Sequence, residues 1–244
     1  MIFPKETFVN TLHPRDYEDI KFGVEIAQSA INLTILARGC PVVIACEQRW
    51  WEYGSAIQML LNSAGMENIG KLDILDVGSG WSGLGPAINL TWDANVVEYE
   101  PIDQYRIDRE RTNQIIRSYG KKGTRCLKED LKLMPGDQFD AVFCISVLEH
   151  VAKADEKKCW VNLADRVKPG GLLFITCDVV DDNSKPHIYD EMRVMPNYTL
   201  QDMRERVEML IDCCKMHPYG IPDYKYNGDM VHDFTFFRAG FIKG

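Results

Sequence analysis

A carboxylate followed by closely spaced glycines stands about one third of the way along the chain. Residues 72–85 read LDILDVGSGWSGLG, in which Asp76 precedes Gly78 by two positions and Gly80 and Gly83 follow. Glycine adopts backbone angles that a residue with a Cβ atom resists, so a ligand can contact the bare main chain of such a turn. The bare G-x-G-x-x-G pattern fits a nicotinamide-binding turn, and it fits a turn without a ligand as well.

The carboxylate of Asp76 favours one kind of ligand over the others. A dinucleotide pyrophosphate is anionic and would be repelled by a carboxylate at the mouth of the turn. S-adenosylmethionine has no phosphate there, and its amino group and sulfonium are both cationic. We therefore expect the turn to bind S-adenosylmethionine rather than NAD.

A second acidic position follows at the end of a predicted strand over 95–99. Glu98 follows Gly78 by 20 residues, about the spacing at which an acid reaches the ribose hydroxyls of a bound nucleoside. A carboxylate can accept hydrogen bonds from both hydroxyls at once. Glu100 is the alternative, but its place directly before Pro101 indicates a loop or the start of a helix. We favour Glu98.

Over roughly residues 70–180 the chain resembles the class I S-adenosylmethionine-dependent methyltransferases. The similar segments are, in chain order, LDILDVGSGWSG, VVEYEP, CLKEDL, FDAVFCISVLEHV and RVKPGGLLFITC. The likeness is to the small-molecule type found among bacterial saccharide and natural-product methyltransferases. It implies methyl transfer from S-adenosylmethionine by a Rossmann-like α/β fold with a mostly parallel, seven-stranded sheet.

The resemblance also implies particular residues around the cofactor. Asp130 and Leu131 would border the adenine, and Ile145 and Ser146 would lie beside the methionine portion. The full set that we expect to bind the cofactor is Asp76, Gly78, Ser79, Gly80, Trp81, Glu98, Tyr99, Asp130, Leu131, Ile145 and Ser146.

Methyl transfer is an in-line displacement at a sulfonium, so the enzyme must align the acceptor and often remove its proton. His150 is the candidate general base because its ordinary pKa suits neutral pH. In many relatives the same LEH run has a structural or cofactor-side role, and that alternative stays open. Glu149 and His150, with Asp178, Asp181 or Asp182, could hold a divalent metal. A solvated turn explains the last two acids as well, and we expect no metal.

Aromatic residues gather among charges in residues 47–53, EQRWWEY. They could pack the N-terminal helices on the sheet, or form a lid over the cofactor or acceptor. The segment is similar to an R-x-W-E-Y stretch in some bacterial saccharide and natural-product methyltransferases. The candidate substrate-binding residues are Trp51, Tyr53, Glu149 and His187.

Apolar patterning predicts an alternation of strands and helices that would bring these residues to one edge of a parallel sheet. The expected strands lie near 72–77, 95–99, 124–127, 139–145, 171–177 and 234–243. The expected helices lie near 16–38, 49–64, 83–90, 102–118, 156–167 and 199–214, the last with Thr199 as its N-cap. The family has one more strand between the last helix and the closing strand, which the sequence does not place.

These elements predict a doubly wound fold with helices on both faces. Residues 1–70 would form a helical extension or lid, and residues 71–244 the methyltransferase domain, within a single globular unit. Neither the pattern nor the composition specifies an oligomeric state.

Charge and composition indicate which classes of partner the protein does not bind. The 244 residues carry a formal net charge of −8, which argues against a nucleic-acid acceptor because phosphate contacts need clustered Lys and Arg. The fourth predicted strand lacks the Asn/Asp-Pro-Pro-aromatic tetrad and the Pro-Cys pair of many nucleic-acid methyltransferases. The first residues are too polar for a signal peptide, and the apolar runs are too short to span a membrane. We expect a cytoplasmic protein without a membrane partner.

The leading hypothesis is therefore methyl transfer to an oxygen or nitrogen of a small-molecule or saccharide acceptor. The alternatives are a non-catalytic S-adenosylmethionine-binding module and a nicotinamide oxidoreductase. Neither the acceptor nor the methylated atom can be predicted from the sequence, because the acceptor pocket would come from its least regular segments.

Overall fold

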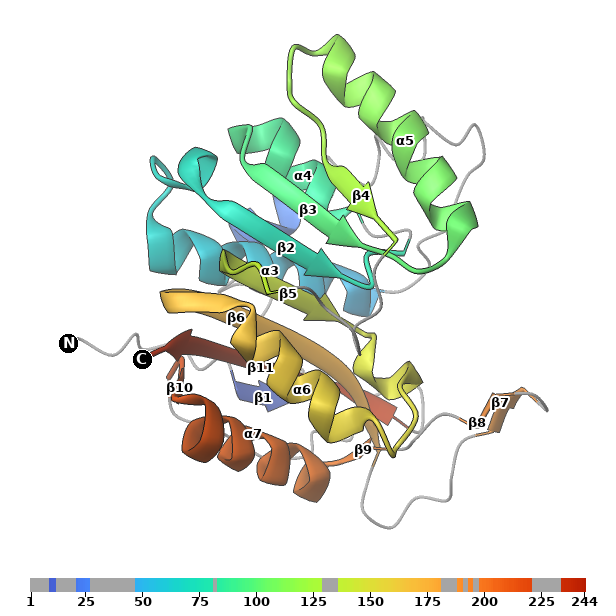
Figure 1. Ribbon diagram of the computed structural model, residues 1–244, viewed down its shortest axis with the longest axis vertical. Coiled ribbons are helices and arrows are strands. Elements are labelled where there is room, and N and C mark those ends of the chain that lie inside the picture. The colour runs from blue at the N-terminus through green and yellow to red at the C-terminus, as the bar shows by residue number, and fades with distance from the viewer. Residues whose placement is uncertain are drawn as a thin grey trace.

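The computed structural model describes residues 9–11, 21–26, 47–80, 83–128, 136–180, 188–190, 193–194, 198–220 and 234–244. A mixed β-sheet runs through the centre of the molecule, with helices on both of its faces (Figure 1). Its parallel strands are, in spatial order, β4 (Arg125–Leu127), β3 (Asn95–Tyr99), β2 (Asp73–Val77), β5 (Phe139–Ile145) and β6 (Val167–Val180). The antiparallel β11 (Phe234–Lys243) follows β6. The expected doubly wound, mostly parallel sheet is confirmed.

The far edge of the sheet contains the strand that the sequence did not place. This strand is β10 (Met216–Pro218), which pairs with the end of β11 in antiparallel fashion. A second short strand, β1 (Val9–Thr11), pairs with β11 over residues 237–239. With β9 (Tyr198–Thr199) beside β6, the described part of the sheet has nine strands, two more than expected.

A separate pair of short strands lies away from this sheet. They are β7 (Ile188–Asp190) and β8 (Arg193–Val194), which pair with each other in antiparallel fashion (Figure 1).

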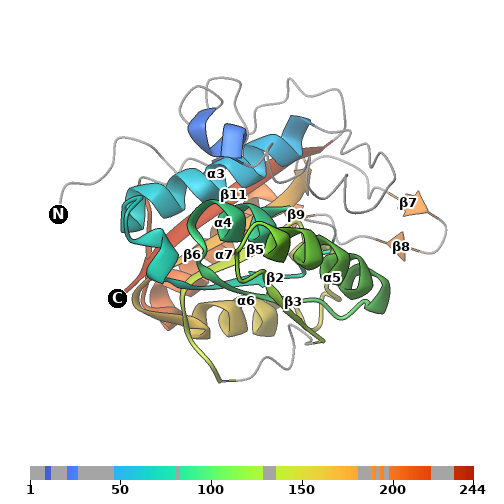
Figure 2. The same ribbon diagram turned by 90° about the horizontal axis from the view of Figure 1, so that it is seen from above.

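The helices cover both faces of the sheet. Figure 2 shows α3, α4 and α5 on one side of the sheet and α6 on the other. Their bounds are α3 (Glu47–Ala64), α4 (Leu84–Trp92), α5 (Asp103–Ser118), α6 (Glu156–Asp165) and α7 (Leu200–Cys214), with short 3₁₀ helices η1 (Ile69–Lys71) and η3 (Leu148–His150). Each lies within a few residues of its predicted range, except that the helix expected over 16–38 is described only at 21–26. In the described part of the chain no helix is both long and apolar enough to cross a lipid bilayer.

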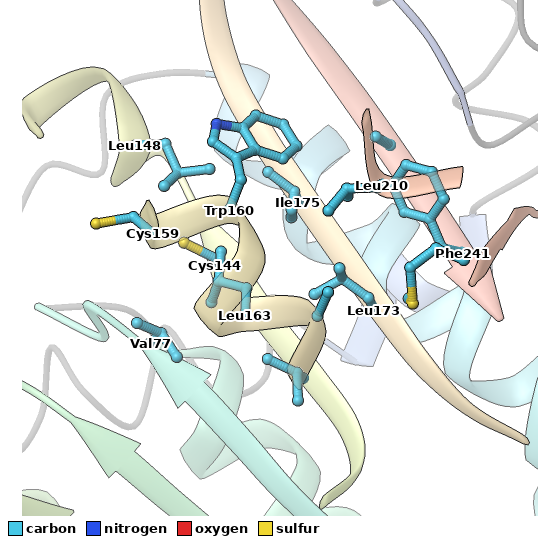
Figure 3. Close-up of a cluster of buried hydrophobic side chains, with 14 of the residues drawn as sticks. Val77, Cys144, Leu148, Cys159, Trp160, Leu163, Leu173, Ile175, Leu210 and Phe241 are labelled. Carbon is cyan, nitrogen blue, oxygen red and sulfur yellow. The ribbon is translucent and has the colours of Figure 1, made fainter. Parts of the chain in front are cut away.

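The central strands are apolar throughout because both faces of the sheet are buried. Successive side chains of a strand point to opposite faces, so Ile74 and Leu75 of β2 enter two different clusters. Leu75 lies with α6 and α7 in the cluster that contains Trp160 (Figure 3). Ile74 lies with α3 and α4, where Ile57 and Ile88 are fully buried.

The described parts of residues 1–70 are therefore built into the sheet and its core. β1 continues the sheet edge, and α3 shares its apolar cluster with β2. This arrangement gives α3 a fixed position relative to the carboxyl ends of the strands, where the candidate site lies.

Candidate functional site

The glycine turn follows the carboxyl end of β2 and has the backbone that its sequence predicts. Gly78 and Gly80 have φ values of +67° and +47°, in the left-handed region that glycine tolerates best. The Gly78 N–H donates to the carbonyl of Tyr99 at 2.8 Å, which ties the turn to the end of β3. A Cβ atom on Gly78 would lie 2.5 Å from Cγ2 of Val147, so a larger residue does not fit there.

Glu100 binds the main chain of this turn through its carboxylate. Its Oε2 accepts a hydrogen bond from the Gly80 N–H at 2.7 Å, and its Oε1 accepts one from the Ile102 N–H at 2.8 Å. A Cβ atom on Gly80 would meet only ordinary contacts, the nearest being 3.8 Å away. A Cβ atom would therefore touch Gly78 and the Tyr105 ring without a clash, and the Glu100 carboxylate lies beside the Gly80 main chain.

Glu98 lies inside the protein, two residues before Glu100. Its carboxylate is fully buried, forms an ion pair with Nε of Arg109 at 2.9 Å, and accepts a hydrogen bond from the Thr124 hydroxyl. A Cβ atom on Gly85 would lie 2.8 Å from Glu98 Oε1, so α4 covers this carboxylate closely. The geometry favours Glu100 over Glu98 as the acid at the turn, because β3 ends at Tyr99 and Glu100 is the one that bonds the Gly80 N–H.

Asp76 is also buried, and its surroundings oppose its charge. Burial raises the pKa of its carboxyl well above the ordinary value, and the nearby Glu98 carboxylate raises that pKa further. The positive charge of Arg109 and, more weakly, the Gly85 main chain lower that pKa but do not offset the rise. Oδ2 of Asp76 and Oγ of Ser79 are buried without a hydrogen-bond partner among the described residues. Buried polar atoms are normally paired, so these two atoms, at the carboxyl end of β2 and in the glycine turn, are candidates for contact with a ligand.

Ser146 ends β5 in a left-handed conformation, with φ +50°. Its N–H donates to the carbonyl of Thr176 at 3.1 Å and to the hydroxyl of the same residue at 3.2 Å. Its own hydroxyl donates to Oε1 of Glu52 at 2.6 Å. Ile145, the residue before it, is almost fully buried. The end of β5 is therefore fixed by groups from β6 and from α3.

Glu149 and His150 follow within η3, beside the glycine turn. Glu149 is buried and His150 is exposed. The His150 N–H donates to the carbonyl of Val147, whose side chain lies against Gly78. This position brings His150 near the turn on the solvent side, and its role as a base stays a prediction.

Trp51 and Tyr53 of α3 mainly pack. Trp51 is fully buried, with the guanidinium carbon of Arg238 at 4.9 Å from its ring centroid. Arg238 also donates to the hydroxyl of Ser55 at 2.7 Å. Tyr53 belongs to the apolar cluster under α3. Packing is therefore the better interpretation of these two aromatics.

The residue of this segment that reaches the site is Glu52, which sequence reasoning missed. The only signal for it was a charged residue between two aromatics that pack.

Several predicted residues fall outside the described part of the chain. They are Trp81, Asp130, Leu131, Asp181, Asp182 and His187. Within the described ranges no group of three or more His, Cys, Asp or Glu side chains is arranged to hold a metal ion.

Residues 75–175 match the family model described as a methyltransferase domain. No curated protein sequence matches the chain.

Several solved structures have the same fold. The [4+2]-cyclase SpnF is 14% identical, with a TM-score of 0.58, over 91% of this chain and 96% of its own. Magnesium protoporphyrin IX methyltransferase from Synechocystis PCC 6803, with bound S-adenosylmethionine, is 12% identical, with a TM-score of 0.55, over 93% and 97%. The 1,6-didemethyltoxoflavin-N1-methyltransferase from Burkholderia thailandensis is 12% identical, with a TM-score of 0.54, over 95% and 91%. At such identities these likenesses show the fold alone.

Proposed function

We propose that this chain transfers the methyl group of S-adenosylmethionine to oxygen or nitrogen of a small-molecule or saccharide acceptor. The match of residues 75–175 to the model of a methyltransferase domain supports the proposal. The observation that carries the proposal is the glycine turn. There, the Gly80 N–H donates to the Glu100 carboxylate, and Oδ2 of Asp76 is buried with no hydrogen-bond partner among the described residues. This is a site for a ligand with hydroxyls and a positive charge.

The residues at the turn fit the methyl donor in three ways. Glu100 is the residue that we propose for the ribose hydroxyls, because a carboxylate accepts from two donors at once. Asp76 and Ser79 offer buried polar atoms to the cationic portion, and Gly78 and Gly80 allow close approach to the main chain. When bound, the donor supplies an electrophilic methyl group on a positively charged sulfur.

The remaining predicted contacts stay part of the proposal. Tyr99 and Ile145 end β3 and β5 at the same edge of the sheet as the turn. Ser146 lies directly after Ile145 and is nearly buried. We propose these strand ends as the floor of the donor site, with Trp81, Asp130 and Leu131 completing it.

His150 is the residue that we propose to remove a proton from the acceptor. Its side chain is exposed directly after β5, so an acceptor can approach it from solvent. Glu149 lies beside it in η3, and Trp51, Tyr53 and His187 complete the earlier set of acceptor-side candidates. The burial of Trp51 and Tyr53 argues against direct contact with the acceptor for these two.

The acceptor class rests on chemistry and on the names of proteins with the same fold. The formal net charge of −8 disfavours a nucleic acid. Two solved structures of this fold are named as methyltransferases of a porphyrin and of a toxoflavin precursor, both small molecules.

A direct test is methyl transfer from labelled S-adenosylmethionine to a library of metabolites and saccharides. The proposal predicts acceptor-dependent formation of S-adenosylhomocysteine together with a labelled product. Binding of the donor without transfer to any class of acceptor would favour a binding module, and oxidation or reduction with NAD would favour the oxidoreductase alternative.

A further inference from the structure

Glu52 joins the N-terminal helix to the ends of two core strands. It lies on α3, its side chain is fully buried, and its Oε1 accepts hydrogen bonds from the hydroxyls of Ser146 and Thr176. These partners are 94 and 124 residues away in the chain. Burying a carboxylate costs free energy unless hydrogen bonds compensate. The two hydroxyl donors therefore offset the cost of burying Glu52, which an apolar residue at this position would not incur.

Ser146 needs such support because of its backbone. A φ of +50° is unfavourable for a residue other than glycine, and such conformations persist only where the surroundings hold them. The Thr176 carbonyl and hydroxyl both accept from the Ser146 N–H, and Glu52 accepts from its hydroxyl. The Thr176 hydroxyl also donates to Glu52, so the Glu52 and Thr176 side chains and the main chain and hydroxyl of Ser146 form one network.

This network determines what Ser146 can offer a ligand. A carboxylate only accepts hydrogen bonds, so the hydroxyl hydrogen of Ser146 is committed to Glu52. The lone pairs of the same oxygen then remain to accept from a donor such as an ammonium group. Ser146 lies at the carboxyl end of β5, the edge of the sheet that also carries the glycine turn.

We infer that Glu52 is a positioning residue, which fixes Ser146 at the donor site and sets its hydroxyl to accept from the amino group of the methionine portion. The inference rests on the proposed function, because it assumes that this portion lies beside Ser146. It assigns to α3 a part in donor binding through Glu52.

Calorimetric titration with S-adenosylhomocysteine tests the inference, since this ligand keeps the amino group and cannot react. Glu52→Ala is expected to weaken binding about tenfold, the size of one hydrogen bond to a charged or well-placed group. Glu52→Gln is expected to stay within about threefold of the unchanged protein, because its amide oxygen can still accept from the hydroxyls. Ser55→Ala is the matched control, since it removes a different buried hydrogen bond of the same helix, from Arg238 to the Ser55 hydroxyl, and leaves the Glu52, Ser146 and Thr176 side chains in place.

Three outcomes would overturn the inference: an unchanged affinity in Glu52→Ala, an equal loss in Ser55→Ala, or a Glu52→Gln variant as weak as Glu52→Ala. The last would show that charge, not position, is what matters. If Glu52→Ala does not fold, Thr176→Val decides, with an expected loss of about threefold from one missing hydroxyl and an unchanged affinity as the contrary result. Absence of binding by the unchanged protein would instead contradict the proposed function.

Discussion

Asp76 combines two properties that oppose each other. Its carboxylate is 2% exposed and close to Glu98, so the folded protein disfavours its charge. Its position at the glycine turn is where a cationic ligand would need that charge. A buried carboxylate of this kind destabilises the ligand-free protein, and its charge becomes favourable when a cationic ligand binds. This pattern is typical of functional sites.

Asp76→Asn is therefore expected to stabilise the ligand-free protein at neutral pH, by about 1 kcal/mol or more. The pKa of Asp76 is raised on folding, so the native state binds more protons than the unfolded state. Stability then falls as pH rises from the unfolded value of about 4 towards the folded pKa. The advantage of the variant should be small near pH 4 and grow with pH, as measured by urea denaturation. A constant advantage, or a loss at every pH, would contradict this explanation.

Changing Glu98 or Glu100 to Gln is expected to affect different properties: the affinity for the ligand in one variant and the free energy of unfolding in the other. Glu100→Gln should weaken S-adenosylhomocysteine binding about tenfold, because Glu100 lies at the turn, and should lower the free energy of unfolding by only about 1 kcal/mol, because one of its two main-chain hydrogen bonds remains. Glu98→Gln should lower the free energy of unfolding by about 1.5–3 kcal/mol, because it breaks the buried pair with Arg109. Titration calorimetry and urea denaturation of both variants provide the comparison. The opposite pattern would restore Glu98 as the ribose ligand.

His150→Gln tests the proposed base. Removal of a general base typically lowers kcat by about 10²–10⁴-fold. The side chain is exposed, so the melting temperature and the affinity for S-adenosylhomocysteine should stay the same. An unaltered kcat with the true acceptor would assign the LEH run a structural role instead.

At the scale of elements, local signals predicted most of the core. Continuous apolar runs located β2, β3 and β5 within a residue, because both faces of the sheet bury their side chains. The N-cap Thr199 is confirmed, since its hydroxyl accepts from the Asp202 N–H in a reciprocal capping box. The short edge strands β1 and β10 carry no such pattern, because their pairing with β11 depends on distant residues.

Thr199→Ala is expected to lower the free energy of unfolding by about 1 kcal/mol, the usual cost of a lost N-cap. Thr91→Ala is the matched control, because the Thr91 hydroxyl donates to the Ala87 carbonyl within α4 and caps no helix end. That change should have little effect, since such a bond in a helix adds little stability. Chemical denaturation measures both, and equal losses would contradict a specific role for the cap at α7.

For the whole molecule, spacing located the site only to within two residues. The distance from Gly78 could not distinguish Glu98 from Glu100, because spacing does not show which side chain the fold buries against Arg109 and which lies at the turn. Glu52 was beyond prediction for a related reason. Its partners lie 94 and 124 residues away, and long-range polar contacts leave no local pattern.

Ligand-linked stability tests the central claim most directly, because a ligand that binds only the native state raises the melting temperature. The chain should be titrated by calorimetry with S-adenosylhomocysteine and, separately, with NAD, and its melting temperature measured with each. The account predicts saturable binding and a higher melting temperature with the sulfur-containing nucleoside, and neither effect with the dinucleotide. Tight binding of NAD without binding of S-adenosylhomocysteine would contradict it.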